Sequence, residues 1–201
     1  MFYEPEKNNH GLPHRPFKTL VAPRPIGWIS TISPAGVANL APYSFFNGVS
    51  DDPPTVMFSS QGRKDSLRNA EATGEFVCNI VSYDMRDEMN ASSASVSSDV
   101  DEFELAGLDK APCRLVKAPR VARAPAALEC KTLKIVNLPG PDGVTEGNHV
   151  VFGTVVGIHI ADDMIVDGVV SPTRIRALAR LGNQDYASVD SVFSLIRPDN
   201  L

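Results

Sequence analysis

The sequence has few cysteines, and their spacing matches neither a disulfide framework nor a zinc knuckle. Cys78, Cys113 and Cys130 are odd in number and include no CxxC pair, so neither of those structures is predicted. Cys78 and Cys130 stand inside apolar runs, where a free thiol packs as a small hydrophobic side chain. We therefore expect the cysteines to have a packing role.

Long apolar runs and an excess of positive charge are also absent. No stretch reaches the roughly 18 apolar residues that a membrane helix needs, and the first residues lack the basic and apolar regions of a secretory leader. The net charge of −5 at neutral pH does not favour nucleic acid or an anionic membrane as a partner. These absences predict a cytoplasmic protein that binds neither.

Several motifs of nucleotide, hydrolase and metal chemistry are missing. No two glycines are separated by a single residue, so the GxGxxG fingerprint is excluded, and the chain has neither a Gly-Lys dipeptide nor a GxSxG elbow. The four histidines form no HExxH motif, and Gly11 and Pro13 disfavour a helix through His10 and His14. We predict no metal site and expect any chemistry to come from an organic cofactor.

The 201 residues do contain a series of short strand patterns, and a chain of this length typically forms one domain. Helix patterns are few: 64–73, with Asp65 or Ser66 as N-cap and Gly74 after the end, a helix and mobile loop over 84–98, and a turn over 101–106. Runs of β-branched and aromatic residues predict strands at 26–32, 39–46, 55–59, 76–81, 128–138 and 149–161.

The run from 149 to 161 is mostly apolar on both faces, and Gly153 and Gly157 share one face. Glycines placed in this way let the wall of a barrel bend, because no side chains crowd the inside of the curve. Residues 164–170 are expected to pair with this strand, and His159 is expected to be structural and outside any cluster. Short strands at close spacing predict a mainly β, closed or partly closed barrel with helical insertions.

Four motifs, taken together, resemble those of the flavin reductase-like FMN-binding proteins, a split-barrel family that includes flavoredoxins. They occur in family order and spacing, and the resemblance extends from about residue 16 to about residue 186. The motifs are Arg24-Pro25-Ile26-Gly27-Trp28-Ile29-Ser30-Thr31, Asn39-Leu40-Ala41-Pro42-Tyr43-Ser44-Phe45-Phe46-Asn47, Ser50-Asp51-Asp52-Pro53-Pro54, and Lys64-Asp65-Ser66 before a short helix.

The resemblance implies a fold, a cofactor and partners. The fold would be a split β-barrel of Greek-key type with a few short helices, formed by residues 23–186 between an extended arm at 1–22 and a tail at 187–201. The cofactor would be FMN, held near the interface of a homodimer. NADH or NADPH would pass a hydride to flavin N5, and the electrons would go on to a monooxygenase or another acceptor.

The turn before the 64–73 helix suits the phosphate of FMN. Arg63 and Lys64 supply two positive charges, and Ser66 supplies a hydroxyl beside unpaired backbone N–H groups at the helix start. Asp65 is expected to cap the helix, since its charge would repel a phosphate. The alternative interpretation of this turn is a surface helix with flanking charges.

Polar residues at the ends of the first two strands would bind the carbonyl and N3–H edge of the flavin, although such residues are also common turn formers. Ser59 and Ser60, after the third strand, lie where the phosphate-binding turn should begin. Trp28 is expected near the flavin or in the core, and Arg24 is expected to contact the phosphate or to pair across the dimer. The predicted cofactor-binding residues are Arg24, Trp28, Ser30, Thr31, Ser44, Phe46, Asn47, Ser59, Ser60, Arg63, Lys64 and Ser66.

His149, at the start of the long strand, is the predicted catalytic residue. Similar flavin reductases have a histidine here, where an imidazole would donate a hydrogen bond or place positive charge near the reduced flavin; the alternative is a strand-end histidine bonded to backbone. Residues 180–186 resemble the family's Arg-Leu-Gly-Gly-x-x-Tyr segment, with Asn183 in place of the second glycine. Asparagine tolerates a left-handed backbone better than most residues, so the turn can be kept. Tyr186 is a candidate for the interface or for a lid over the cofactor.

Two functions remain open from the sequence. The first is an NAD(P)H-dependent flavin reductase-like enzyme. The second is an FMN-binding electron carrier, similar to flavoredoxin, that pyridine nucleotides do not reduce directly. A pyridoxamine-phosphate-oxidase-like enzyme on the same barrel is a third interpretation, and the motifs disfavour it.

Overall fold

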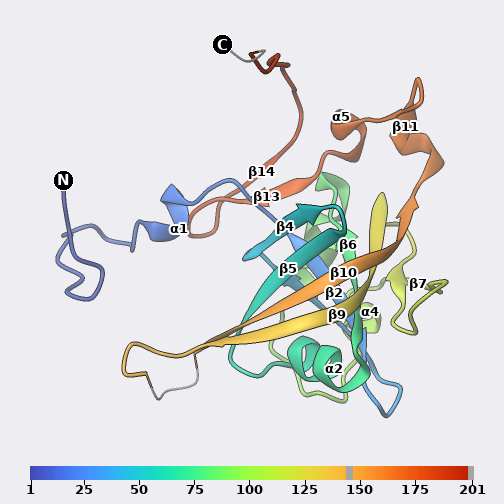
Figure 1. Ribbon diagram of the computed structural model, residues 1–201, viewed down its shortest axis with the longest axis horizontal. Coiled ribbons are helices and arrows are strands. Elements are labelled where there is room, and N and C mark those ends of the chain that lie inside the picture. The colour runs from blue at the N-terminus through green and yellow to red at the C-terminus, as the bar shows by residue number, and fades with distance from the viewer. Residues whose placement is uncertain (144–146, 199–201) are drawn as a thin grey trace.

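The computed structural model describes residues 1–143 and 147–198, and most of its regular structure is β (Figure 1). The helical elements are short: α1 (Phe17–Leu20), α2 (Asp65–Thr73), η1 (Tyr83–Met85), α3 (Arg86–Ala91), α4 (Glu102–Leu105), η2 (Asp162–Met164) and α5 (Pro172–Ile175). The strands are β1 (Arg24–Pro25), β2 (Gly27–Ile32), β3 (Ala38–Tyr43), β4 (Phe46–Asp51), β5 (Pro54–Gln61), β6 (Glu75–Ile80), β7 (Lys110–Ala111), β8 (Arg120–Val121), β9 (Ala126–Leu138), β10 (Asn148–Ile160), β11 (Ile165–Val166), β12 (Val169–Val170), β13 (Leu178–Arg180) and β14 (Tyr186–Ser188). The predicted mainly β class is confirmed.

Seven strands form one antiparallel sheet in the order β3-β2-β6-β9-β10-β5-β4. The long pair β9 and β10 runs across the middle of the molecule (Figure 1). Its register shifts between Phe152 and Gly153 and between Val155 and Gly157. A Cβ atom at Gly153 would overlap the ring of Phe76, so β10 bends over that ring at a glycine, as the sequence predicts.

The sheet curls toward closure around an aromatic core. Tyr43 of β3 and Phe58 of β5 belong to strands near opposite ends of the sheet order, yet their ring centroids are 4.9 Å apart. Phe58 also contacts Phe76 of β6 at 5.2 Å, edge to face. The apolar residues of α2, Leu67 and Ala70, are fully buried in the same core. This helix therefore covers one opening of the curled sheet and fixes the position of its own N-terminus.

The packing role predicted for two cysteines agrees with their burial. Cys78 and Cys130 are fully buried in the aromatic core. Burial raises the pKa of both thiols well above the ordinary value, so both stay protonated and unreactive at neutral pH.

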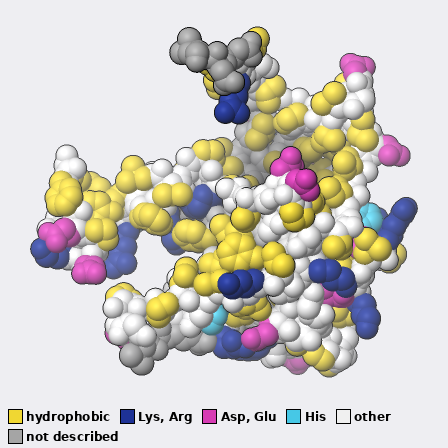
Figure 2. All heavy atoms as spheres, in the orientation of Figure 1, with side chains coloured by type: hydrophobic (Ala, Val, Ile, Leu, Met, Phe, Trp, Pro, Cys, Tyr) yellow, Lys and Arg dark blue, Asp and Glu magenta, His cyan; other side chains and the backbone are white. Residues whose placement is uncertain are grey.

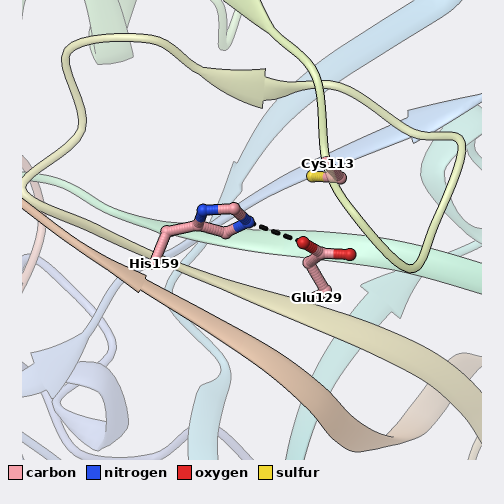
Figure 3. A group of neighbouring side chains, drawn as sticks. All are labelled: Cys113, Glu129 and His159. Atoms are coloured by element: carbon pink, nitrogen blue, oxygen red, sulfur yellow. Dashed lines mark hydrogen bonds and ion pairs between the residues drawn. The ribbon is translucent and has the colours of Figure 1, made fainter.

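His159 belongs to a cluster, and the expectation that it stands outside one is wrong (Figure 3). Its Nε2 atom lies 2.6 Å from Oε1 of Glu129, a buried carboxylate on the neighbouring strand β9. Glu129 also accepts backbone hydrogen bonds from residues 114, 115 and 116 at 2.6–3.0 Å. Figure 3 shows the sulfur of Cys113 on the same loop nearby, and burial raises the pKa of its thiol to about 11.

The residue types of this cluster are those that bind zinc. The Glu129 oxygens, however, are already occupied by four donors, which identifies the carboxylate as the anchor of the 114–116 loop. That the protein binds no metal stays a prediction.

Three local expectations also need correction. Lys64 is the N-cap of α2, because the helix begins at Asp65 and no side chain caps it; Gly74 does end it in the left-handed conformation, as predicted. The run 39–46 is two strands, because β3 ends at Tyr43 and the chain bends before β4. Residues 164–170 pair with themselves as β11 and β12, because Asp167 and Gly168 both have positive φ and form the tight turn of a hairpin.

The predicted arm and tail extend from the curled sheet (Figure 1), and the last three residues of the tail lie outside the described residues. Hydrophobic side chains stand exposed along the arm (Figure 2), among them Phe2, Phe17 and Leu20. A Cβ atom at Gly182 would overlap Thr19 of α1, so this glycine lets the arm pack against the 181–185 turn. Within the described residues, no helix has both the length and the apolar character needed to cross a bilayer.

Candidate functional site

A cavity of about 500 Å³, here named the α2 cavity, opens beside the first turn of α2. That volume lies within the range of small-molecule sites, roughly 300–1,000 Å³. The ends of β3 and β5, the bend before β4, the segment 92–98 and α4 complete its walls. Its polar lining includes Asn39, Tyr43, Ser44, Ser59, Gln61, Arg63, Lys64, Asp65, Ser66, Arg68 and Glu102.

The first turn of α2 presents an arrangement suited to an anion. The leading N–H groups of a helix have no partner inside the helix, and here no side chain caps them. Arg63 forms an ion pair with Glu71, and Arg68 pairs with Asp65 at 3.1 Å. Lys64 forms no ion pair with any described residue, so its positive charge is available beside the uncapped turn.

A buried hydrogen-bond network supports this turn from behind. The Ser66 hydroxyl donates to Oδ1 of Asn39 at 2.7 Å, and Nδ2 of Asn39 donates to both carboxylate oxygens of Glu102 at 3.0 Å. Glu102 also accepts from the backbone N–H of Leu40 at 2.9 Å. The network fixes the orientation of the Asn39 amide and, through it, the hydroxyl of Ser66.

Glu102 and Tyr43 are buried ionisable groups facing the α2 cavity. Burial raises the pKa of Glu102, and its hydrogen bonds from Leu40 and Asn39 offset only part of that effect. Burial likewise raises the pKa of the Tyr43 phenol, which therefore stays protonated at neutral pH. The cavity thus holds a neutral donor beside a carboxylate whose ionisation is disfavoured.

Five of the predicted cofactor-binding residues come together around this cavity: Ser44, Ser59, Arg63, Lys64 and Ser66. They come from three separate chain segments, so their convergence is a property of the fold.

Four predicted residues lie directly behind the walls instead. Trp28 is fully buried and donates from Nε1 to Oγ of Ser92, a lining residue, at 2.9 Å. Thr31 bonds to Asn39 and Asn69. The Ser60 hydroxyl donates to the carbonyl of Gly62 at 3.0 Å. Phe46 is a core residue whose ring occupies the space that a Cβ atom at Gly27 would need.

Three more of the predicted residues have other surroundings. The Ser30 hydroxyl is buried and donates to the carbonyl of Pro119 at 2.6 Å. Asn47 is exposed on the edge strand β4, where it accepts from the N–H of Gly48. Arg24 is buried, and its guanidinium donates to three carbonyl groups, those of Lys18, Val21 and Leu181. Arg24 therefore ties the arm to the barrel, and its predicted phosphate contact has no geometric support.

His149 is the second residue of β10 and lies directly opposite Ser60 of β5. Only 5% of its surface is exposed, and it does not line the α2 cavity. The residue of β5 that precedes Ser60, Ser59, does line the cavity. His149 therefore lies close behind the cavity wall that Ser59 forms. Its predicted catalytic role stays a prediction.

Sequence reasoning missed a serine-rich wall and the charged end of the network. The loop predicted to follow a helix within 84–98 supplies Ser92, Ser93, Ser95 and Ser98 to the lining of the α2 cavity, a role that the sequence analysis did not assign to it. The signal was the density of serines in Ala-Ser-Ser-Ala-Ser-Val-Ser-Ser. Glu102 carried no local signal, because only the tertiary fold brings α4 against β3.

Comparison with known proteins gives a consistent picture. A family model described as a flavin reductase like domain matches residues 20–174. A relative from Aquifex aeolicus, which is itself called an uncharacterized protein, is 40% identical over 173 residues, covering 83% of this chain and 85% of the relative.

Solved structures share the fold over nearly the whole chain. Nitrilotriacetate monooxygenase component B from Bacillus cereus has a TM-score of 0.90 and 28% identity, and the match covers 97% of this chain and 98% of that one. An FMN-binding protein from Thermus thermophilus has a TM-score of 0.76 with 16% identity, covering 97% and 99% of the two chains. At that identity, the second likeness concerns the fold alone.

Proposed function

Because the chain belongs to the flavin reductase-like family and folds as a split β-barrel, we propose that it is an FMN-binding oxidoreductase. Its FMN lies in the α2 cavity and is reduced by NADH or NADPH, and the electrons pass to a further acceptor. One observation carries the proposal: Lys64, which pairs with no acidic side chain in 1–143 or 147–198, stands beside an uncapped helix turn in a cavity large enough for a ligand.

The residues of the cavity fit the parts of FMN. The uncapped N–H groups and Lys64 would hold the phosphate, which is the usual use of a helix N-terminus that faces a cavity. Ser44, Ser59 and the buried Tyr43 phenol offer donors and acceptors to the ribityl chain and the ring. Bound FMN would supply the redox chemistry, by accepting a hydride at N5.

The protein's own contribution is to position the cofactor and the reductant and to adjust the charge near the flavin. The Glu102–Asn39–Ser66 network holds the phosphate-binding turn in one arrangement before the ligand arrives, which lowers the cost of ordering on binding. A reductant must be held with its reacting carbon about 3–3.5 Å from N5. His149, close behind the Ser59 wall, would place a proton or positive charge near the flavin as it gains electrons.

The electron acceptor is suggested by a protein of similar structure. The Bacillus cereus structure is component B of a monooxygenase, so we propose that reduced flavin or its electrons go to a monooxygenase or another acceptor. We also propose a homodimer with the cofactor near its interface, acting in the cytoplasm. The exposed apolar side chains along the arm suit contact with a second subunit.

The test mixes purified holoprotein anaerobically with NADH and, separately, NADPH while flavin absorbance is recorded. The proposal predicts bleaching of the flavin band by at least one of the two. Photochemical reduction of the same sample is the control that the bound flavin can be reduced at all. A flavin that bleaches in light and with neither nucleotide would contradict the reductase and would favour the electron carrier. A purified protein that binds no FMN would overturn both.

A further inference from the structure

Two further cavities border the α2 cavity in turn, a small one that we name the neck and a larger one beyond it. The neck, a cavity of about 150 Å³, shares Pro42, Ser44 and Ser93 with the α2 cavity. It shares Met89 and Tyr186 with a larger space of about 630 Å³, here named the outer cavity. The shared lining residues make the three cavities neighbours, and the neck lies between the proposed flavin position and the outer cavity.

Arg180 of β13 lines this neck, and its side chain is held in a fixed pose. The guanidinium lies over the ring of Tyr186, 4.4 Å from its centroid, and donates to the Tyr186 hydroxyl and to the carbonyl of Asn183. Asn183 has a left-handed backbone, with φ of 49°, which turns that carbonyl toward the arginine. Arginine has five N–H donors, so three remain for a ligand.

The positive charge of Arg180 has no acidic partner among the described residues. Its neighbour on the adjacent strand is Arg24, paired with it in the register of β1 and β13, and Arg24 also lacks one. Burial, followed by repulsion from Arg180, lowers the pKa of Arg24. Two adjacent arginines thus leave an uncompensated positive potential at the neck. Arg176, by contrast, pairs with Asp190 at 3.0 Å and with Asp84 at 3.4 Å.

We infer that Arg180 binds an anionic group of the redox substrate, a phosphate or a carboxylate, while the rest of that substrate reaches the flavin. The inference rests on the proposed function, because it places the flavin in the α2 cavity. Arg180 contacts the anion, and the buried Arg24, whose guanidinium donates to three backbone carbonyls, adds to the positive potential from behind. Apolar Ile26, Pro42 and Met89 line the neck together with the uncharged polar residues Ser44, Asn90 and Ser93. Arg180 is therefore the charged group of this lining, and a substrate with one anionic group fits it.

Two sets of probes test this inference. Within each set the compounds undergo similar redox chemistry, but some carry an anionic group and one does not. The reductants are NADH and NADPH against 1-benzyl-1,4-dihydronicotinamide, which has no phosphate. The oxidants of the photoreduced holoprotein are 4-nitrobenzoate against its uncharged amide. Anaerobic stopped-flow measurements on FMN-loaded wild type, Arg180→Gln and the control Arg176→Gln give the concentration for half-maximal rate with each probe.

Loss of a charge-assisted hydrogen bond predicts that Arg180→Gln raises this concentration about tenfold or more for the anionic probes. The uncharged probes should change less than twofold, and Arg176→Gln should leave all of them near wild type. An effect on the nucleotides alone identifies a phosphate, and an effect on the nitrobenzoate alone identifies a carboxylate. Both results support the inference.

Equal effects on charged and uncharged probes, or no effect on either anionic class, would overturn it. If Arg180→Gln does not fold, the same measurement on the wild type at rising salt concentration still tests the inference. Salt should raise the concentration for half-maximal rate of the anionic probes and leave that of the neutral probes unchanged. Equal salt dependence for both kinds of probe would overturn the inference. A wild type that no nucleotide reduces contradicts the proposed reductase only, since the oxidant pair still tests Arg180.

Discussion

Two regions of the molecule each contain a buried glutamate, and they use it differently. Glu129, on β9, accepts from three backbone N–H groups and from His159, and these bonds outweigh the effect of burial, which alone raises its pKa, so the pKa falls below the ordinary value. Glu102, on α4, faces the α2 cavity with fewer donors, and burial raises its pKa.

The difference teaches how to separate an anchor from a binding site. Burial is nearly the same for the two side chains, with 1% of Glu129 and 6% of Glu102 exposed. What differs is whether the protein itself supplies all the donors that an ionised carboxylate needs. Around Glu129 it does, so the region is complete without a ligand. Around Glu102 and the first turn of α2, backbone N–H groups without a capping side chain remain available to a ligand.

The largest expected effect is on stability at the anchor. Glu129→Ala removes a fully buried carboxylate and leaves the backbone N–H groups of residues 114, 115 and 116 without their acceptor, the last of them buried. It should lower the free energy of unfolding by about 3–5 kcal/mol. Chemical denaturation measures the change, and FMN affinity should stay near wild type wherever the variant is folded. A stability equal to wild type would show that the 114–116 loop does not depend on this carboxylate.

The complementary change is expected at the binding turn. Lys64→Ala should weaken FMN by about 1.5–3 kcal/mol, through loss of a charge-assisted phosphate contact, and should leave riboflavin affinity and stability unchanged. Titration calorimetry with both ligands gives the comparison. Lys134→Ala removes an exposed lysine on β9 and is the matched control. If FMN affinity is unaffected, the phosphate lies elsewhere.

The smallest effect is a contrast in pH dependence between Glu129→Gln and Glu102→Gln. The pKa of Glu129 is lowered in the folded protein. The wild type therefore has a larger free energy of unfolding than Glu129→Gln above the ordinary pKa of 4.5, and this difference disappears as the pH falls through the lowered pKa. The folded pKa of Glu102 is raised, so the wild type loses stability relative to Glu102→Gln as the pH rises from 4.5 through the raised pKa.

A tenfold difference in proton affinity between the folded and unfolded chain corresponds to about 1.4 kcal/mol of stability for either carboxyl group. Urea denaturation between pH 3 and pH 8 measures both differences. Slopes of the same sign for the two variants would contradict the contrast.

Most of the barrel could be predicted from local pattern. The strands containing Trp28, Phe58 and Phe76 alternate or run apolar, and Gly74 ends α2 as expected. The bending of β10 followed from Gly153 and Gly157, since a missing side chain is visible in the sequence. The self-pairing of 164–170 carried a signal that sequence reasoning missed, because Asp167-Gly168 between two apolar pairs favours a tight hairpin turn.

The site was predictable where one segment supplies it and much less so elsewhere. Lys64 and Ser66 belong to one turn, and their proximity follows from the chain. Trp28 and Ser30 belong to a motif of the resemblance, yet they stand two positions apart on β2 and so share a face, and both are fully buried away from the cavity lining. The link from Ser66 to Glu102 crosses 36 positions of sequence and exists only because Asn39 joins them.

A crystal structure of the protein soaked with FMN tests the central claim most directly. Phosphate density should lie against the first turn of α2 within hydrogen-bond distance of Lys64, with the ring extending through the α2 cavity toward Ser44. Phosphate density at another surface, with the α2 turn empty at saturating FMN, would contradict the account.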